Sequence, residues 1–243
     1  MTAPETIRKV DAFWALYFGC TPQEIARAQT IVVSHAALQG YDGALAFRHA
    51  DGLIVSVPTS VPEVERAKLR QAPPAEAFDP KFLAKVFVIG TDKVTGPGWV
   101  GIVDLQDFKP VPSTARLLGD ADEGAMRKLA EACGEVAWQR STMLQIRQPL
   151  FGLFQGPDLV AASGYVVMGS VLAYIGVIAH PAHRGKGFAK MVVSSAVAEA
   201  FRHGLIAQLR TTHANESAVA LAQSIGFRHY ASTYDVKLIE DEF

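Results

Sequence analysis

The chain has 243 residues, 49% of them hydrophobic, and a formal net charge of −1. This length allows one large core or two smaller ones, and it favours two domains. A charge so close to zero argues against broad binding to nucleic acid or to an anionic membrane surface. Two cysteines are too few for a disulfide framework, and the first ten residues lack the basic and apolar regions of a signal peptide. We therefore expect a cytoplasmic protein.

The first hundred residues predict structure but carry no motif of a recognisable chemistry. Apolar spacing, capping residues and turn signals define their elements. In chain order, the expected elements are helices 7–18 and 22–39, strands 44–47 and 53–57, helices 60–69 and 80–85, and strands 86–90 and 99–103. We expect an N-terminal α/β region, residues 1–105, that shapes an acceptor pocket or forms an oligomer contact.

The second half alternates strand and helix patterns in a regular order. Its expected elements are a helix over 120–133, strands 150–154, 159–167 and 171–179, a helix from Gly187 to about Phe201, a strand over 205–212, a helix opened by Asn215 and a last strand over 230–238. The stretch 159–179 has no charged residue and is long enough to span a bilayer. Its glycines and β-branched residues favour two buried strands instead.

An anion-binding motif lies between the strand 171–179 and the helix that follows it. The sequence there is Arg184-Gly185-Lys186-Gly187. Glycines let backbone N–H groups approach an anion closely, and the unpaired amides of a helix's first turn favour negative charge. Arg184 and Lys186 add charge-assisted contacts. The pattern predicts a diphosphate site, and no Gly-Lys-Ser or Gly-Lys-Thr marks a P-loop.

The segment Tyr174–Ala189, followed by Asn215, Ala218, Leu221 and Gly226-Phe227, resembles the GNAT superfamily of acyl-CoA-dependent acyltransferases. The order of elements extends the resemblance back to about Ser113. It implies a mixed α/β fold with a mixed, largely antiparallel sheet flanked by helices, and a GNAT acyltransferase domain over residues 106–243. The region 1–105 faintly resembles a degenerate second unit of this kind.

The resemblance also implies a cofactor site for acetyl-CoA or another acyl-CoA, and no metal. Backbone groups of Val177, Ile178 and Ala179 would pair with the pantetheine arm. Asn215 would contact the pantetheine arm, although it is also a natural helix cap, and Ser217 would contact that arm or the adenosine phosphates. The pyrophosphate would lie against Arg184, Gly185, Lys186, Gly187, Phe188 and Ala189.

The expected catalytic pair is missing, so the catalytic residues stay unassigned. Ala173 stands where many members of the superfamily have a Glu, and Ala222 where many have a Tyr. A thiol has a pKa of about 8.5, so a departing thiolate needs little acid, but an alkyl amine of pKa about 10 needs a base or water to remove its proton. His213 is the best spare base, with a solvated loop histidine as the plainer interpretation.

Our interpretation is an N-acetyltransferase in which an amine attacks acetyl-CoA directly within a ternary complex. The alternative is a non-catalytic acyl-CoA-binding sensor or scaffold, because the acid and base positions are empty. The acceptor is expected to be a small-molecule or peptide amine. We expect no nucleic-acid or membrane partner, and a homodimer stays open.

Overall fold

The computed structural model describes residues 3–238, which form two compact units interleaved along the chain. The first unit consists of Ala3, Gly101–Arg210 and Ser217–Arg228. The second consists of Pro4–Val100, Thr211–Glu216 and the residues from His229 onward. The chain passes from the second unit into the first within a single strand, β4 (Val94–Val103). A domain boundary after residue 105 stays a prediction.

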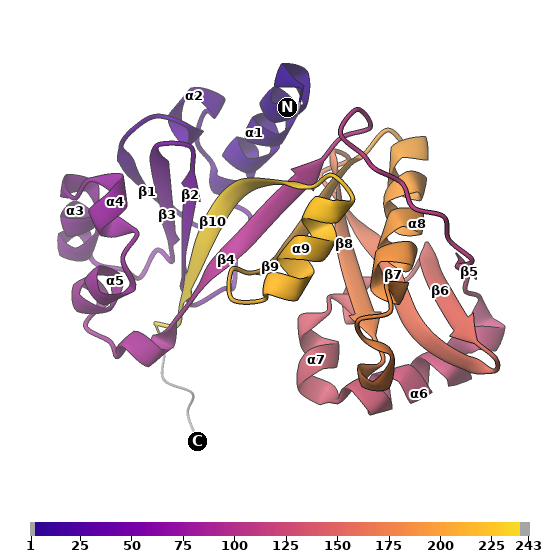
Figure 1. Cartoon of the computed structure of the whole chain (residues 1–243). Helices are drawn as coiled ribbons and strands as arrows, with labels where there is room; N and C mark the ends of the chain where they lie inside the picture. Colours follow the sequence, from indigo (N-terminus) through magenta and orange to yellow (C-terminus); the bar gives the residue numbers. More distant parts are fainter. Residues whose placement is uncertain (1–2, 239–243) are drawn as a thin grey trace. The chain divides into compact units, whose positions relative to one another are not determined.

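The second unit is a sheet with helices on both faces (Figure 1). Its sheet order is β1-β3-β2-β10, followed by the N-terminal part of β4. Strand β1 pairs parallel to β3, whereas β2 pairs antiparallel to both β3 and β10. Its elements are α1 (Pro4–Phe18), α2 (Pro22–Ile25), β1 (Thr30–Ser34), β2 (Ala44–His49), β3 (Gly52–Val57), α3 (Glu63–Gln71), α4 (Pro74–Ala77), α5 (Pro80–Phe87), a 3₁₀ turn at Thr91–Lys93, and β10 (Arg228–Val236).

Alternation along β2 explains the two cores of this unit. Phe47 faces α1, where its ring lies 4.7 Å from that of Trp14 and 5.1 Å from that of Phe18. Its neighbour Ala46 points to the opposite face and packs in a cluster with Leu69 of α3. Successive side chains of a strand point to opposite faces, so each face of the sheet buries its own set of apolar residues.

Two expectations for the N-terminal half are wrong. The helix expected over 22–39 ends after one turn at Ile25, where Thr21 and Glu24 form a capping box. The β-branched residues in Thr30–Ser34 form strand β1, which pairs with β3, so the helix does not continue through them. The strand expected over 86–90 is also absent, because α5 continues to Phe87. The expected Asp79 cap of α5 is confirmed, since its carboxylate accepts from the N–H groups of residues 81 and 82.

The first unit contains an antiparallel meander joined to one parallel strand. Its sheet order is β9-β8-β7-β6-β5, with the C-terminal part of β4 beyond β9. The expected mixed α/β fold, with a largely antiparallel sheet between helices, is confirmed. The elements are β5 (Arg116–Leu117), α6 (Glu123–Cys133), α7 (Glu135–Arg140), β6 (Leu150–Gln155), β7 (Asp158–Met168), β8 (Leu172–Ala179), α8 (Phe188–Arg202), β9 (Ile206–Thr212) and α9 (Glu216–Ser224), with 3₁₀ turns at Asp120–Asp122, Met143–Gln145 and Pro181–His183.

Helices α6 and α8 cover opposite faces of this sheet (Figure 1). Leu159 and Ala162 of β7 pack in the cluster of α6, whereas Val160 and Ala161 pack in the cluster of α8. Two consecutive residues share a face because the β6–β7 register shifts there, which is a β-bulge. The uncharged stretch 159–179 thus forms most of β7 and all of β8, and within residues 3–238 no helix is long and apolar enough to cross a membrane.

Candidate functional site

The C-terminal end of β8 has one paired edge and one open edge. Towards β7 the strand is paired as far as Ala161↔Ala179, and His180 N continues the ladder by donating to Val160 O at 2.9 Å. Towards β9 the parallel register ends at Ile175↔Leu209. Strands β8 and β9 therefore separate beyond Ile175, and the last residues of β8 lack a strand on that side within residues 3–238.

Backbone alternation identifies which groups face the open edge. In a strand, the N–H and C=O of one residue point to the same side, and those of the next residue to the other. Since His180 N points to β7, Val177 and Ala179 must turn their backbone groups away from β7. Gly176 O fits this pattern, because it accepts a hydrogen bond of 2.8 Å from the Oγ of Ser163 on β7. The open edge thus presents one N–H and one C=O each from Val177 and Ala179.

The loop after β8 ends in a cluster of free backbone N–H groups. A 3₁₀ turn over Pro181–His183 leads into residues 184–187, and α8 begins at Phe188. Gly185 and Gly187 have φ angles of +76° and +80°, the left-handed region that favours glycine. The N–H groups of residues 185–190 meet no acceptor within the described chain, and Met191 N makes the first contact back, to Gly187 O at 3.2 Å.

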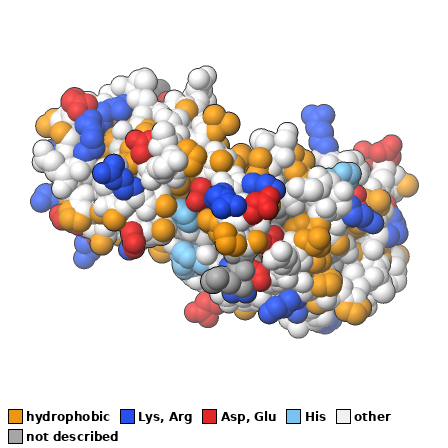
Figure 2. Space-filling view, turned by 90° about the horizontal axis from the view of Figure 1, so that it is seen from above, with side chains coloured by type: hydrophobic (Ala, Val, Ile, Leu, Met, Phe, Trp, Pro, Cys, Tyr) orange, Lys and Arg blue, Asp and Glu red, His pale blue; other side chains and the backbone are white. Residues whose placement is uncertain are grey.

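The loop and the first turns of α8 carry basic side chains and no acidic one. Between His180 and Ala198 the chain contains three basic residues, Arg184, Lys186 and Lys190, and no acidic one. On the face drawn in Figure 2, by contrast, basic and acidic side chains lie interspersed. The free N–H groups, the N-terminal dipole of a 15-residue helix and the basic side chains all favour a bound anion.

Cys133, at the end of α6, lies against the open edge of β8. Its Sγ donates to Ala179 O at 3.5 Å. Burial raises the pKa of this thiol above its ordinary value, and the positive charge of Arg184 opposes part of that rise. The sequence predicted the helix that carries this cysteine, over residues 120–133. It gave no indication of the contact with β8, because the two residues are 46 positions apart.

The two positions expected to hold an acid and a base are both in the core. Ala173 of β8 and Ala222 of α9 are fully buried. Tyr165 is buried as well, and its pKa is raised, mainly by desolvation. Tyr174, which adjoins Ala173 on β8, is half-buried. None of these positions offers an exposed side chain for proton transfer.

The remaining candidates fall in different units. Ser217 belongs to the first unit, like residues 177–179 and 184–189. Asn215 belongs to the second unit, where its N–H donates to Thr212 O at 3.0 Å. His213 also lies in the second unit, with its Nε2 3.0 Å from the Oγ of Ser232 and its ring 5.5 Å from that of His229. The pKa of His229 is lowered, first by burial and then by the nearby His213.

His180 and His183 flank the 3₁₀ turn, with ring centroids 5.2 Å apart. The Nδ1 of His180 accepts from Ala182 N at 3.2 Å and so helps to fix the turn. Within residues 3–238, no group of three or more His, Cys, Asp or Glu side chains is placed to hold a metal ion.

Comparisons with known proteins agree with this geometry. Residues 124–227 match the model of the acetyltransferase (GNAT) family. The match begins in α6 and includes the open edge of β8 and the anion loop. The similarity to the GNAT acetyltransferase family thus covers residues 124–227. A comparison with curated proteins found no match.

One solved structure shows the same fold over almost the whole chain. A GCN5-related N-acetyltransferase from Kribbella flavida aligns over 95% of this chain and 94% of its own, with 15% identity and a TM-score of 0.51. A candidate GNAT acetyltransferase from Novosphingobium aromaticivorans is 28% identical over 58% of this chain, with a TM-score of 0.46, and a GNAT acetyltransferase from Colwellia psychrerythraea is 20% identical over 59%, with a TM-score of 0.49. The alignments span 63% and 56% of those two proteins.

Proposed function

We propose that the protein is an N-acetyltransferase of the cytoplasm that transfers an acetyl group, or another acyl group, from its CoA thioester to an amine. The observation that carries the proposal is the row of free N–H groups over residues 185–190, placed directly after the open edge of β8. Together they offer an anion site next to a strand edge whose backbone groups can pair with an extended molecule. A CoA molecule has a group for each of them, because its pyrophosphate is an anion and the arm attached to it contains amides.

In this proposal the pyrophosphate lies against residues 184–189, which supply backbone N–H groups and the side chains of Arg184 and Lys186. The pantetheine amides pair with the N–H and C=O groups of Val177 and with the N–H of Ala179, as an added strand would, while the C=O of Ala179 accepts from Cys133. Ile178 keeps its backbone groups in the ladder with β7 and its side chain in the α6 core. Ser217 of the first unit is proposed as a further cofactor contact.

The acyl transfer then depends on the position of the amine relative to the thioester more than on an acid that protonates the leaving thiolate. The amine nitrogen attacks the thioester carbonyl carbon, the tetrahedral intermediate collapses, and CoA leaves as a thiolate. A thiol with a pKa of about 8.5 is a good leaving group near neutral pH, so the buried Ala222 is compatible with turnover. Ala173 cannot accept the proton of the amine, so that proton must go to water or to the side chain of another residue. A weakly basic amine, already neutral at pH 7, is therefore the acceptor class that this site suits best.

A second candidate is an acyl-CoA-binding sensor or scaffold that does not transfer the acyl group. It is favoured by one observation, that Ala173 and Ala222 are both buried and unable to move a proton. Binding would be the same in both cases, so only turnover separates them.

The test is calorimetric titration of the whole protein with acetyl-CoA, free CoA and dephospho-CoA, followed by a thiol-release assay against a panel of amines. We expect micromolar binding of acetyl-CoA and free thiol only when both acetyl-CoA and a suitable amine are present. Binding without thiol release for any amine would favour the sensor. No binding of any of the three nucleotides would overturn the assignment of the site.

A further inference from the structure

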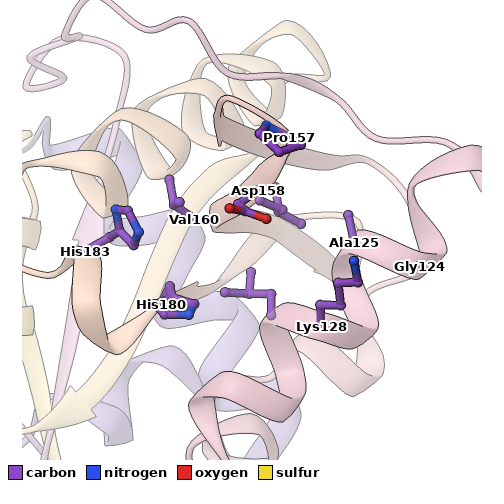
Figure 3. A pocket seen from close by; sticks show the side chains of 10 residues that line it. Gly124, Ala125, Lys128, Pro157, Asp158, Val160, His180 and His183 are labelled. Carbon is purple, nitrogen blue, oxygen red and sulfur yellow. The ribbon is translucent and has the colours of Figure 1, made fainter.

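A pocket opens on the α6 side of the first unit, next to the anion loop but not lined by it. It has a volume of about 460 Å³. Figure 3 shows side chains from three segments around it: the N-terminal half of α6, the start of β7 with the preceding turn, and the two histidines of the 3₁₀ turn. The lining residues are Gly124, Ala125, Lys128, Leu129, Pro157, Asp158, Leu159, Val160, His180 and His183.

The pocket contains two opposite charges that do not neutralise each other. Lys128 from α6 and Asp158 from β7 both line it. Neither forms an ion pair or a side-chain hydrogen bond with any residue in the described chain. A lysine and an aspartate that face one cavity without meeting leave an ammonium and a carboxylate available to a third group placed between them.

Of the two histidines that line the pocket, His180 adds a hydrogen-bond donor. His180 Nδ1 accepts a hydrogen bond from Ala182 N, so the ring proton lies on Nε2, which is a donor. His183 Nδ1 is buried and has no hydrogen-bond partner in residues 3–238. Because this nitrogen is buried, a molecule in the pocket does not reach it without a movement of the ring, and the pocket's polar contacts come from the other side chains.

From this arrangement we propose that the pocket binds a small zwitterion, a molecule that carries an ammonium group and an acid group a few bonds apart. The acid group would contact Lys128 and the Nε2–H of His180. The ammonium would contact Asp158. A simple anion would meet the Asp158 carboxylate, and a simple cation would meet Lys128, so each charge of the pocket selects against ligands of one sign.

The size and place of the pocket agree with this class of ligand. Its volume lies in the range of small-molecule sites, about 300–1,000 Å³. It lies on the α6 side of the sheet, whereas the free N–H groups of residues 185–190 belong to the loop and first turn of α8. The pocket is lined by the turn that precedes the anion loop and not by residues 184–189.

The experiment measures binding to the whole protein in the absence of CoA. The probes are glycine, β-alanine and phosphoethanolamine, with acetate and methylamine as ligands that carry one charge only. Thermal-shift titration gives the first readout and calorimetry the second. We expect saturable binding at millimolar or lower concentration for at least one zwitterion, and none for acetate or methylamine.

Matched variants then assign the site. Lys128→Gln and Asp158→Asn should each weaken zwitterion binding about tenfold or more, because each removes a charge-assisted contact. Arg127→Gln removes a neighbouring, exposed charge of α6 outside the pocket and should leave binding unchanged. Equal binding of all three variants, equal binding of acetate, or no saturable binding of any zwitterion would overturn the proposal. Carboxylate and phosphate zwitterions are told apart by which probe binds more tightly.

Discussion

A glutamate at Gly187 should separate the stability of α8 from its ability to bind an anion. Gly187 precedes α8 with φ +80°, and Gly204 follows it with φ +71°. An added Cβ would meet nothing within 4 Å at either position. Both substitutions therefore cost only backbone strain, about 1–2 kcal/mol. The helix dipole stabilises a carboxylate at the N-terminus by about 0.3–1 kcal/mol and destabilises one at the C-terminus by a similar amount.

The binding arithmetic differs much more between the two sites. A carboxylate about 5 Å from one phosphate charge repels it by about 1–3 kcal/mol for effective dielectric constants of 80 to 20. Two phosphate charges then predict a loss of CoA affinity of about 30-fold or more for Gly187→Glu. The other end of this 15-residue helix is about 22 Å away, beyond the screening length of physiological salt, so Gly204→Glu should bind CoA normally.

Circular dichroism melts and CoA titration of both variants provide the assay. Gly204→Glu should melt lower than Gly187→Glu but bind CoA as the unmodified protein does. For a protein of this size, each 1 kcal/mol corresponds to about 2–4 °C in Tm. The reasoning is refuted if folded Gly187→Glu keeps its affinity, or if Gly204→Glu loses affinity to the same extent.

Three further outcomes are expected. The pKa of Asp122 is lowered to about 2, first by its hydrogen bonds from Arg116, so the pair stabilises the fold above pH 4 and this contribution disappears as the pH falls towards 2. Arg116→Ala should flatten the pH dependence of unfolding in that interval, and an unchanged slope would contradict it. If CoA pairs along β8, it should slow the alkylation of Cys133 at pH 8 but not that of Cys20. Burial raises the pKa of Cys20 to about 11. Mass spectrometry of the two peptides measures both rates, and equal protection of both cysteines, or of neither, would contradict the pairing. Ser163→Ala removes a fully buried hydroxyl that donates to β8, and denaturant unfolding should show a loss of about 1 kcal/mol, whereas no loss would mean that the bond does not stabilise β8.

Local patterns predicted the C-terminal half well, because its elements follow one another with clear turn signals. The strands of the meander, the loop 184–187 and α8 lie within one or two residues of their expected bounds. The helix expected over 22–39 failed because apolar residues in Thr30–Ser34 fit a helical spacing equally well, and only pairing with β3 decides for a strand.

The site was predicted only where it is local in sequence. The glycines and basic residues of 184–187 indicated the anion loop from the sequence alone. The open edge of β8 depends on where β9 stops pairing, and the pocket with Lys128 and Asp158 depends on how α6 lies on β7. The bulge that shifts Val160 has no residue signature of its own. These features arise from contacts between distant segments, which periodicity does not encode.

The place of β10 has a consequence for how the protein is made. In the second unit, β10 pairs along β2 from Ala231↔His49 to Val236↔Ala44. A ribosome therefore has to release almost all of the described chain before the N-terminal sheet can be completed. Until then β2 presents an unpaired edge, which is a hazard for aggregation. Co-translational folding should begin with segments of the first unit, although they are encoded later, and the earliest-made half should be the last to finish.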